Sequence, residues 1–248
     1  MQFQNYKFRP SSIGKIMTGF DTPNLTEVME RDLSELLAKV TLTEAQAKKR
    51  DELTKRRDAE KQLSAGAITY VHDLVDQIYY DYKDFITSKY FDKGIICEQM
   101  AIDYLNTNLF TNYTKFPEGK YENDFLVSKG CDIKDGRIIR DIKNAWSKKT
   151  MPRFKSEILS HDYKWQGIAY MYLFDADEFH LDYVLMPTPE NLIGYENKDL
   201  HNVENLPFEK RYKTASIKRD PALEKLIEQA VKLARVEMND YFDLLIND

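Results

Sequence analysis

The sequence predicts one α/β domain, over residues 1–248, with a helical insertion. The hydrophobic content of 42% is enough for a sizeable buried core in a chain of 248 residues. Apolar residues at helical spacing precede short alternating runs typical of strands, and one more helix and one more strand follow. This helix–strands–helix–strand order, without internal repeats, is the pattern of an α/β domain.

The first part of the chain is expected to be helical. Residues 9–20 predict a loop and a short helix, and the polar segment at about 25–62 predicts a charged helical hairpin projecting from the core. The next helix is expected over about 65–87. Its buried side should consist of Ile68, Val71, Leu74, Val75 and Ile78.

Lys93-Gly94 opens the next expected helix, Ile95–Leu109. Its period places a glutamate, Glu98, on a stripe shared with apolar residues: Ile95, Ile102 and Leu105. A glutamate on an apolar stripe has two explanations. It is partly exposed or ion-paired, or it has a functional role.

Short β-type runs follow Pro117. Their expected ranges are Asp124–Ser128, Gly130–Ile133 and Arg137–Lys143, and an Asp-Gly turn joins the last two as a hairpin. The remaining elements are a helix over His161–Phe174, a strand over Glu178–Met186, a loop-rich stretch with Pro187, Pro189 and Pro207, and an amphipathic helix from about Pro221 to Leu245.

Composition excludes several classes of protein. Two cysteines, Cys97 and Cys131, lack CxxC spacing and predict neither a disulfide framework nor a thiolate-held metal. The chain has no run of 18 or more apolar residues and no apolar amino-terminal stretch, so we expect a cytoplasmic protein with no membrane partner. The net charge of −5 argues against a uniformly basic packaging protein.

Basic residues are instead concentrated in two segments. The first contains Arg137, Arg140, Lys143, Lys148, Lys149, Arg153 and Lys155, and the second Lys210, Arg211, Lys213, Lys218 and Arg219. Such clusters are often solvated faces, and they also suit contact with a nucleic-acid backbone.

The predicted hairpin brings together charged residues. Alternation puts Asp141 and Lys143 on one face of their strand, and pairing across the turn places Asp132 near Asp141. Two close carboxylates repel each other unless a cation lies between them. Mg²⁺ or Mn²⁺, which prefer oxygen ligands, would solve this problem, with Glu98 as a third carboxylate. Lys143 would hold or deprotonate a water molecule, and such a set suits phosphodiester hydrolysis.

These residues resemble the PD-(D/E)xK nuclease superfamily, and within it the phage recombination exonucleases of the lambda-exonuclease and YqaJ type. The motif elements are Glu98 on a helix, Asp132 on a strand, Asp141-Ile142-Lys143 on the next strand, and Gln166-Gly-Ile-Ala-Tyr170 on the following helix. Cys131 replaces the usual proline, and the second acid is Asp instead of the commoner Glu. The resemblance covers roughly residues 9–20 and 65–186.

The resemblance implies a restriction-endonuclease-like core, in which helices flank a central mixed β-sheet. It implies Glu98, Asp132, Asp141, Lys143 and Gln166 as catalytic residues, and Mg²⁺ or Mn²⁺ held by the three acids and the backbone carbonyl of Ile142. The implied activity is an exodeoxyribonuclease that degrades duplex DNA from a 5′ end. The implied partners are DNA, a single-strand annealing protein and further copies of the chain in a ring.

Candidate DNA contacts lie around this set. Arg9, Ser11 and Ser12 stand at a helix start suited to an anion, and the resemblance implies that this segment receives a 5′-phosphate. Ser12 is alternatively a simple N-cap. Lys148, Lys149 and Arg153 would meet the DNA backbone, and Tyr170 would face the metal site or DNA. Trp146 is expected to pack in the core.

Each element also has a structural alternative. Asp132 could cap the turn, Asp-x-Lys could be an exposed ion-pairing face, and the Gln166–Tyr170 face could be a helix rim. Two other functions stay open: a structure- or site-specific endonuclease of the same fold, and a non-catalytic DNA-binding module.

Overall fold

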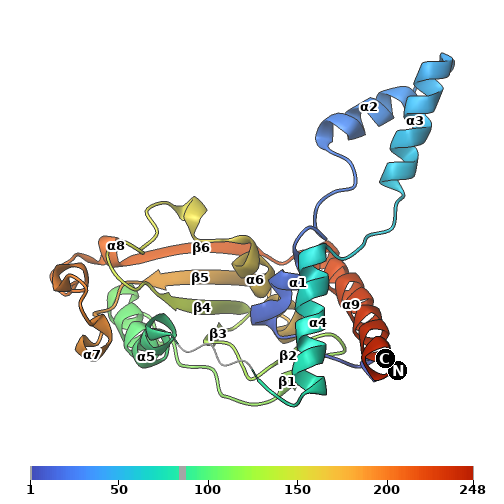
Figure 1. Cartoon of the computed structure of the whole chain (residues 1–248). Coiled ribbons are helices and arrows are strands. Elements are labelled where there is room, and N and C mark those ends of the chain that lie inside the picture. The colour runs from blue at the N-terminus through green and yellow to red at the C-terminus, as the bar shows by residue number, and fades with distance from the viewer. Residues whose placement is uncertain (1, 84–87, 248) are drawn as a thin grey trace.

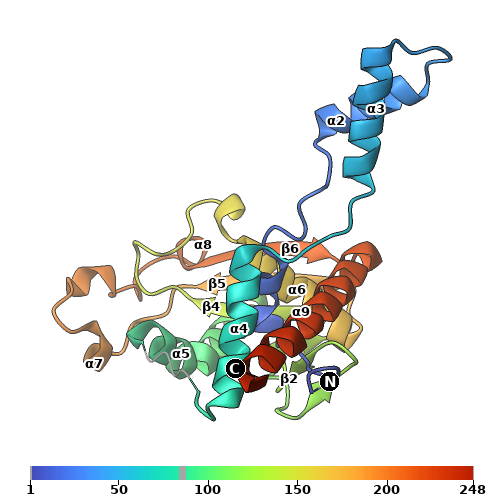
Figure 2. The same cartoon turned by 45° about the vertical axis from the view of Figure 1, so that its right-hand side comes forward.

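The computed structural model describes residues 2–83 and 88–247. A mixed β-sheet has helices on both faces, and a helical hairpin extends away from this body (Figure 1, Figure 2). The predicted α/β class, with a central mixed sheet flanked by helices, is therefore confirmed. No helix in the described part of the chain combines the length and apolar character that a bilayer span requires.

The sheet is built in the order β3-β4-β5-β6. Its strands are β3 (Ile133–Asp135), β4 (Ile138–Asn144), β5 (Glu178–Val184) and β6 (Tyr212–Lys218). β4 and β5 are parallel, whereas both outer pairs are antiparallel. The Asp-Gly turn joins β3 to β4, with Gly136 at a positive φ of 58° that glycine adopts without strain.

Helix α6 (His161–Phe174) connects β4 to β5 and covers one face of the sheet. Its partners on this face are Ile139, Phe179 and Leu181. Also packed here are the short helical turn η1 (Pro10–Ser12), α1 (Ile13–Met17), α4 (Ala65–Tyr79) and α9 (Pro221–Asn247). Helix α5 (Lys89–Leu109) covers the opposite face, against Ile133, Ile142 and Val184.

The charged segment near residue 40 forms α2 (Glu27–Leu37) and α3 (Glu44–Arg57), which project from the body (Figure 2). Threonine side chains, Thr26 and Thr43, cap their amino ends. The pair has its own small apolar cluster: Leu25, Leu33, Leu36 and Leu53. The hairpin therefore has packing of its own, separate from the main core.

Three helical expectations need correction. Helix α4 ends at Tyr79, and residues 84–87 of the range expected for it lie outside the described residues. Ile78, expected to be buried, is 42% exposed at the end of α4. Helix α5 begins at Lys89 instead of Ile95, because Ser88 caps it. Ile95 is therefore 61% exposed, while Lys93 and Cys97 occupy the buried face.

The strand expectations are partly wrong as well. Of the range Asp124–Ser128, only Val127–Ser128 forms a strand (β2), and it pairs with β1 (Tyr121–Glu122). β3 begins at Ile133 and not at Gly130. The stretch expected to be loop-rich contains the edge strand β6 and three short helical segments: α7 (Glu190–Ile193), η3 (Lys198–Leu200) and α8 (Phe208–Arg211).

Candidate active site

Two aspartates lie side by side where β3 begins next to β4. Ile133 pairs with Arg140, so Asp132 stands one step further out, opposite Asp141. Oδ2 of Asp132 accepts a 2.7 Å hydrogen bond from the backbone nitrogen of Ile142. The N–H and C=O of one strand residue point to the same side, so the Ile142 carbonyl also faces the edge that Asp132 occupies.

Asp141 is held by two side chains. It is 2% exposed, on the face of β4 that α6 covers. Oδ1 of Asp141 accepts a 2.9 Å hydrogen bond from Nε2 of Gln166 on α6. Oδ2 lies 2.6 Å from Nζ of Lys143. The alternation of β4 and the position of α6 thus bring three of the predicted residues into direct contact.

Glu98 reaches the same region from α5. Its Oε1 lies 2.8 Å from Nζ of Lys115, and its negative charge acts on Asp132. The half-buried position of Glu98 follows from its place in α5, next to the buried Cys97. The ion-pair explanation of Glu98 therefore holds, and its carboxylate also contributes to the raised pKa of Asp132.

Burial and like charge control the ionisation of this group. Burial, and then the neighbouring Asp141 carboxylate, raise the pKa of Asp132 from 3.8 to about 7. Burial alone would lower the pKa of Lys143, but the contact with Asp141 raises it above its usual 10.5. Burial and the two aspartates also raise the pKa of Tyr170. The region therefore favours an added positive charge.

The site offers hard oxygen donors of the type that a divalent cation prefers, although its three carboxylates are not gathered around one point. Asp141 Oδ2 and Glu98 Oε1 are buried oxygens that accept no hydrogen bond of good geometry, although each faces a lysine ammonium. Among residues 2–83 and 88–247, no three acidic, histidine or cysteine side chains are gathered as a ready metal centre. Lys115 and Lys143 instead provide the positive charge beside the carboxylates. Oxygen ligands of this kind suit Mg²⁺ or Mn²⁺.

The amino-terminal segment with the candidate phosphate contacts packs against α6 and α4. Arg9 and Ser11 are exposed, and Ser12 is half-buried. The hydroxyl of Ser12 donates to the carbonyl of Arg9 over 3.2 Å, and it makes no capping bond to α1. Ser12 is therefore the N-cap residue of α1 by position, but its side chain makes no capping hydrogen bond.

The candidate backbone contacts after β4 lie in the loop at 145–160. Lys148, Lys149 and Arg153 are all exposed. A backbone hydrogen bond fixes the start of this loop, because the nitrogen of Lys148 donates to the carbonyl of Leu200 over 3.0 Å. Trp146 is 6% exposed, so its expected core position is confirmed.

Tyr170, expected to contact DNA or the metal site, is largely buried. It is 8% exposed, and its ring stacks on Phe179 of β5 with centroids 6.5 Å apart. This burial leaves little of the side chain available to DNA. Tyr170 lies near the acidic residues as a core residue of α6.

Two neighbours of the site were not predicted. Lys115 comes from the loop after α5, which is fixed beside the first aspartate because the backbone nitrogen of Phe116 donates to the carbonyl of Asp132. Tyr163, on α6, has its ring centroid 5.1 Å from Nζ of Lys143. Neither position carries a motif, so only the tertiary packing identifies them.

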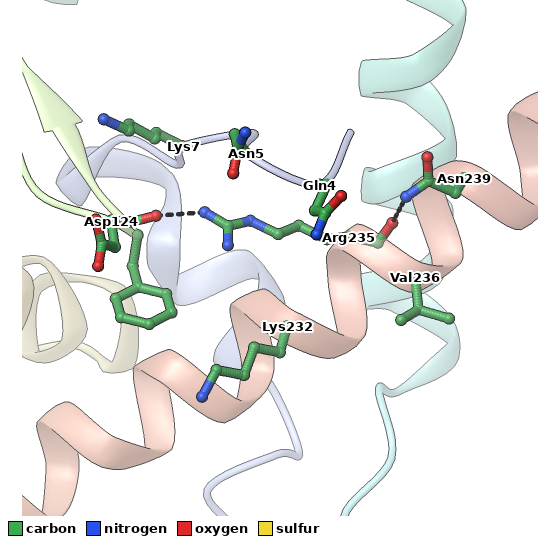
Figure 3. Close-up of a pocket in the computed structure, with 9 residues that line it drawn as sticks. Gln4, Asn5, Lys7, Asp124, Lys232, Arg235, Val236 and Asn239 are labelled. Atoms are coloured by element: carbon green, nitrogen blue, oxygen red, sulfur yellow. Dashed lines mark hydrogen bonds between the residues drawn. The ribbon is translucent and has the colours of Figure 1, made fainter. Parts of the chain in front are cut away.

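A separate hollow of about 750 Å³ lies between the amino-terminal segment and α9 (Figure 3). The Arg235 guanidinium, which lines it, donates to the backbone carbonyls of Tyr6 and Asp124. These bonds tie α9 to two distant segments. Arg235 therefore has a structural role, and none of the catalytic candidates lines this hollow.

No protein-family model and no curated protein matches the sequence. Several solved structures match the fold. A phage-related exonuclease from Haemophilus somnus 129PT aligns with a TM-score of 0.72 and 26% identity, over 99% of this chain and 97% of that one.

An alkaline exonuclease (LHK-Exo) from Laribacter hongkongensis has the same fold, with a TM-score of 0.57 and 14% identity over 98% of this chain and 93% of that one. Its complex with dAMP aligns with a TM-score of 0.52 and 15% identity, over 97% and 95% of the two chains. The resemblance of this chain to the phage recombination exonucleases of the PD-(D/E)xK superfamily is thus confirmed by its fold.

Proposed function

We propose that this protein is a metal-dependent exodeoxyribonuclease that hydrolyses the phosphodiester bonds of duplex DNA, in the 5′ to 3′ direction, for phage-type recombination or DNA processing. The observation that carries the proposal is the junction of Asp132, Asp141 and Lys143 on two adjoining strands. The likeness to solved exonucleases supports it, since one of those proteins was crystallised with dAMP.

Asp132, Asp141 and the carbonyl of Ile142 would hold Mg²⁺ or Mn²⁺, with Glu98 as a direct or water-mediated ligand. A bound divalent cation supplies Lewis-acid polarisation of the scissile phosphate and neutralises its developing charge. Hydrolysis then requires this chain to place water and phosphate correctly.

Lys143 would place the attacking water and stabilise negative charge. Its raised pKa keeps the ammonium protonated at neutral pH, so it acts as a hydrogen-bond donor and fixed cation. Gln166 would act as a positioning residue, because its amide directs Oδ1 of Asp141 and leaves Oδ2 toward Lys143.

Lys148, Lys149 and Arg153 would contact the DNA backbone beyond the acidic residues. Their exposure on a loop held at Leu200 supports this assignment. Arg9, Ser11 and Ser12 would receive the terminal 5′-phosphate, with α6 linking their segment to Gln166.

Degradation of linear duplex DNA in the presence of Mg²⁺ tests the activity. Asp141→Asn and Lys143→Met should each reduce the rate by about 10²–10³-fold, since each removes charge aimed at the reacting phosphate. Chelation with EDTA should abolish cleavage in the wild type. Asp103→Asn, on the exposed face of α5, is the matched control.

The choice of DNA decides between modes of action. An exonuclease requires free ends, so closed circular duplex should resist cleavage while 5′-phosphorylated linear DNA is degraded. Cleavage of the circle would identify an endonuclease. Full activity of Asp141→Asn and Lys143→Met would overturn the assigned site.

The resemblance also motivates two assembly proposals: a ring-shaped homo-oligomer that encircles DNA, and a single-strand annealing protein as partner. Sedimentation of the purified protein tests the first. Co-purification with an annealing protein from the same genome tests the second.

A further inference from the structure

A row of residues crosses the sheet from the acidic site to its far edge. Lys143 of β4 pairs with Tyr183 of β5, which pairs with Lys213 of β6. Residues paired in register point to the same face, so both lysines lie on the face that α6 covers. Neighbouring strands are roughly 4.8 Å apart, which places the two lysine backbones about 10 Å apart.

Lys213 lines a groove of about 340 Å³. The loop at 145–160, which contacts β6 through η2, lines one side of the groove, and residues of α8 and β6 line the other. Figure 1 shows how these elements lie in the fold. The floor of the groove is apolar, and its cations are Lys148, Arg153, Lys210 and Lys213, with Glu209 as an acidic neighbour. The groove thus joins the two basic segments of the sequence.

These four cations are available for a ligand. Within the described residues, none of them has a salt bridge to a carboxylate, and Lys148 only donates to the backbone carbonyl of Asp199. By comparison, Arg137 and Arg219 at the other end of the sheet are paired with Asp175. Unpaired cations around one groove would repel each other unless an anion lies among them.

We propose that this groove, called the β6 groove, binds the phosphate backbone of the DNA strand that passes through the acidic site. The inference rests on the proposed nuclease function and adds Lys210 and Lys213 to the DNA-binding residues. About 10 Å corresponds to roughly three base steps of 3.4 Å along the axis of a duplex, so the β6 groove meets phosphates near the scissile one.

Salt dependence of DNA binding tests the groove without requiring catalysis. Affinity of the full chain for a fluorescent duplex is measured by anisotropy over a series of KCl concentrations in EDTA. Each phosphate contact contributes roughly 0.9 to the slope of log K against log salt. The Lys210→Gln/Lys213→Gln variant should therefore reduce the slope by about 1.8, and so should Lys148→Gln/Arg153→Gln.

The matched control is Lys225→Gln/Lys232→Gln, which removes two exposed charges from α9 and should leave the slope unchanged. An equal change in the control, an unchanged slope in the Lys210→Gln/Lys213→Gln variant, or no binding by the wild type would overturn the proposal. Tighter binding of poly-glutamate than of DNA at equal charge would also overturn it, because the groove would then suit an acidic protein segment. Nuclease activity with Mg²⁺, measured separately, shows whether the proposed function itself fails.

Discussion

A Cβ atom added to Gly167 would lie 2.3 Å from Cδ1 of Phe179. Helix α6 therefore approaches β5 as closely as a glycine allows, and this contact sets the distance between Gln166 and the sheet. The glycine stands inside the motif that carries Gln166 and Tyr170.

Gly167→Ala should lower the free energy of unfolding by about 1–3 kcal/mol, because the buried ring of Phe179 cannot move aside without overpacking the core. Urea unfolding measures this change. Gly94→Ala is the control, since its Cβ would meet open space inside α5 and should stabilise by about 0.5–1 kcal/mol. Equal effects of the two alanines would contradict the packing argument.

Gln166→Ala should reduce the rate of DNA cleavage, or the affinity for Mg²⁺, by about 10–100-fold, because Asp141 loses the donor that orients it. Titration of the rate with Mg²⁺ separates the two effects. Gln99→Ala, on the exposed side of α5, should change neither. A Gln166 variant with wild-type rate and Mg²⁺ dependence would rule out the positioning role.

Lys93→Met should destabilise the fold. The buried ammonium donates to the carbonyls of Ala145, Trp146 and Met186 over 2.7, 3.0 and 2.8 Å, and to Thr188. These acceptors would lose their donor, at a cost of about 1–3 kcal/mol. Urea unfolding near neutral pH measures the loss, and Lys225→Met serves as the exposed control.

The stability difference between the wild type and Lys93→Met should depend on pH. Burial lowers the pKa of Lys93 from 10.5 to about 8. Between these values the unfolded chain holds a proton that the folded protein has released, so this group's contribution to stability grows as pH rises and is lost as pH falls through 8. Methionine does not titrate, so the stability difference between wild type and Lys93→Met should increase across that window. A constant difference would refute the assignment.

Replacement of residues 23–60 by a short Gly-Ser linker should leave the remaining body folded. The hairpin has its own apolar cluster, and Asn24 binds the carbonyls of Arg57 and Ala59, which holds its two ends together. The melting temperature should change by less than about 4 °C, equivalent to roughly 1 kcal/mol for a chain of this size. Loss of cooperative melting would show that α2 and α3 stabilise the main core.

Sequence patterns determined the parts of this protein that depend on local geometry. The Asp-Gly turn and the alternation after it placed Asp141 and Lys143 on one face of a strand and Asp132 beside them, because strand periodicity and turn type are set by neighbouring residues. Helical spacing likewise located most of α5 and α6.

Tertiary structure alone decided the pairing of Lys115 with Glu98, the burial of Lys93, and the strand β6 with its groove. β6 has only a weak alternating pattern, and it becomes a strand because β5 offers it a row of backbone partners. Contacts of this kind depend on burial and hydrogen bonding between segments far apart in the chain, and no local pattern encodes which distant segment will provide them.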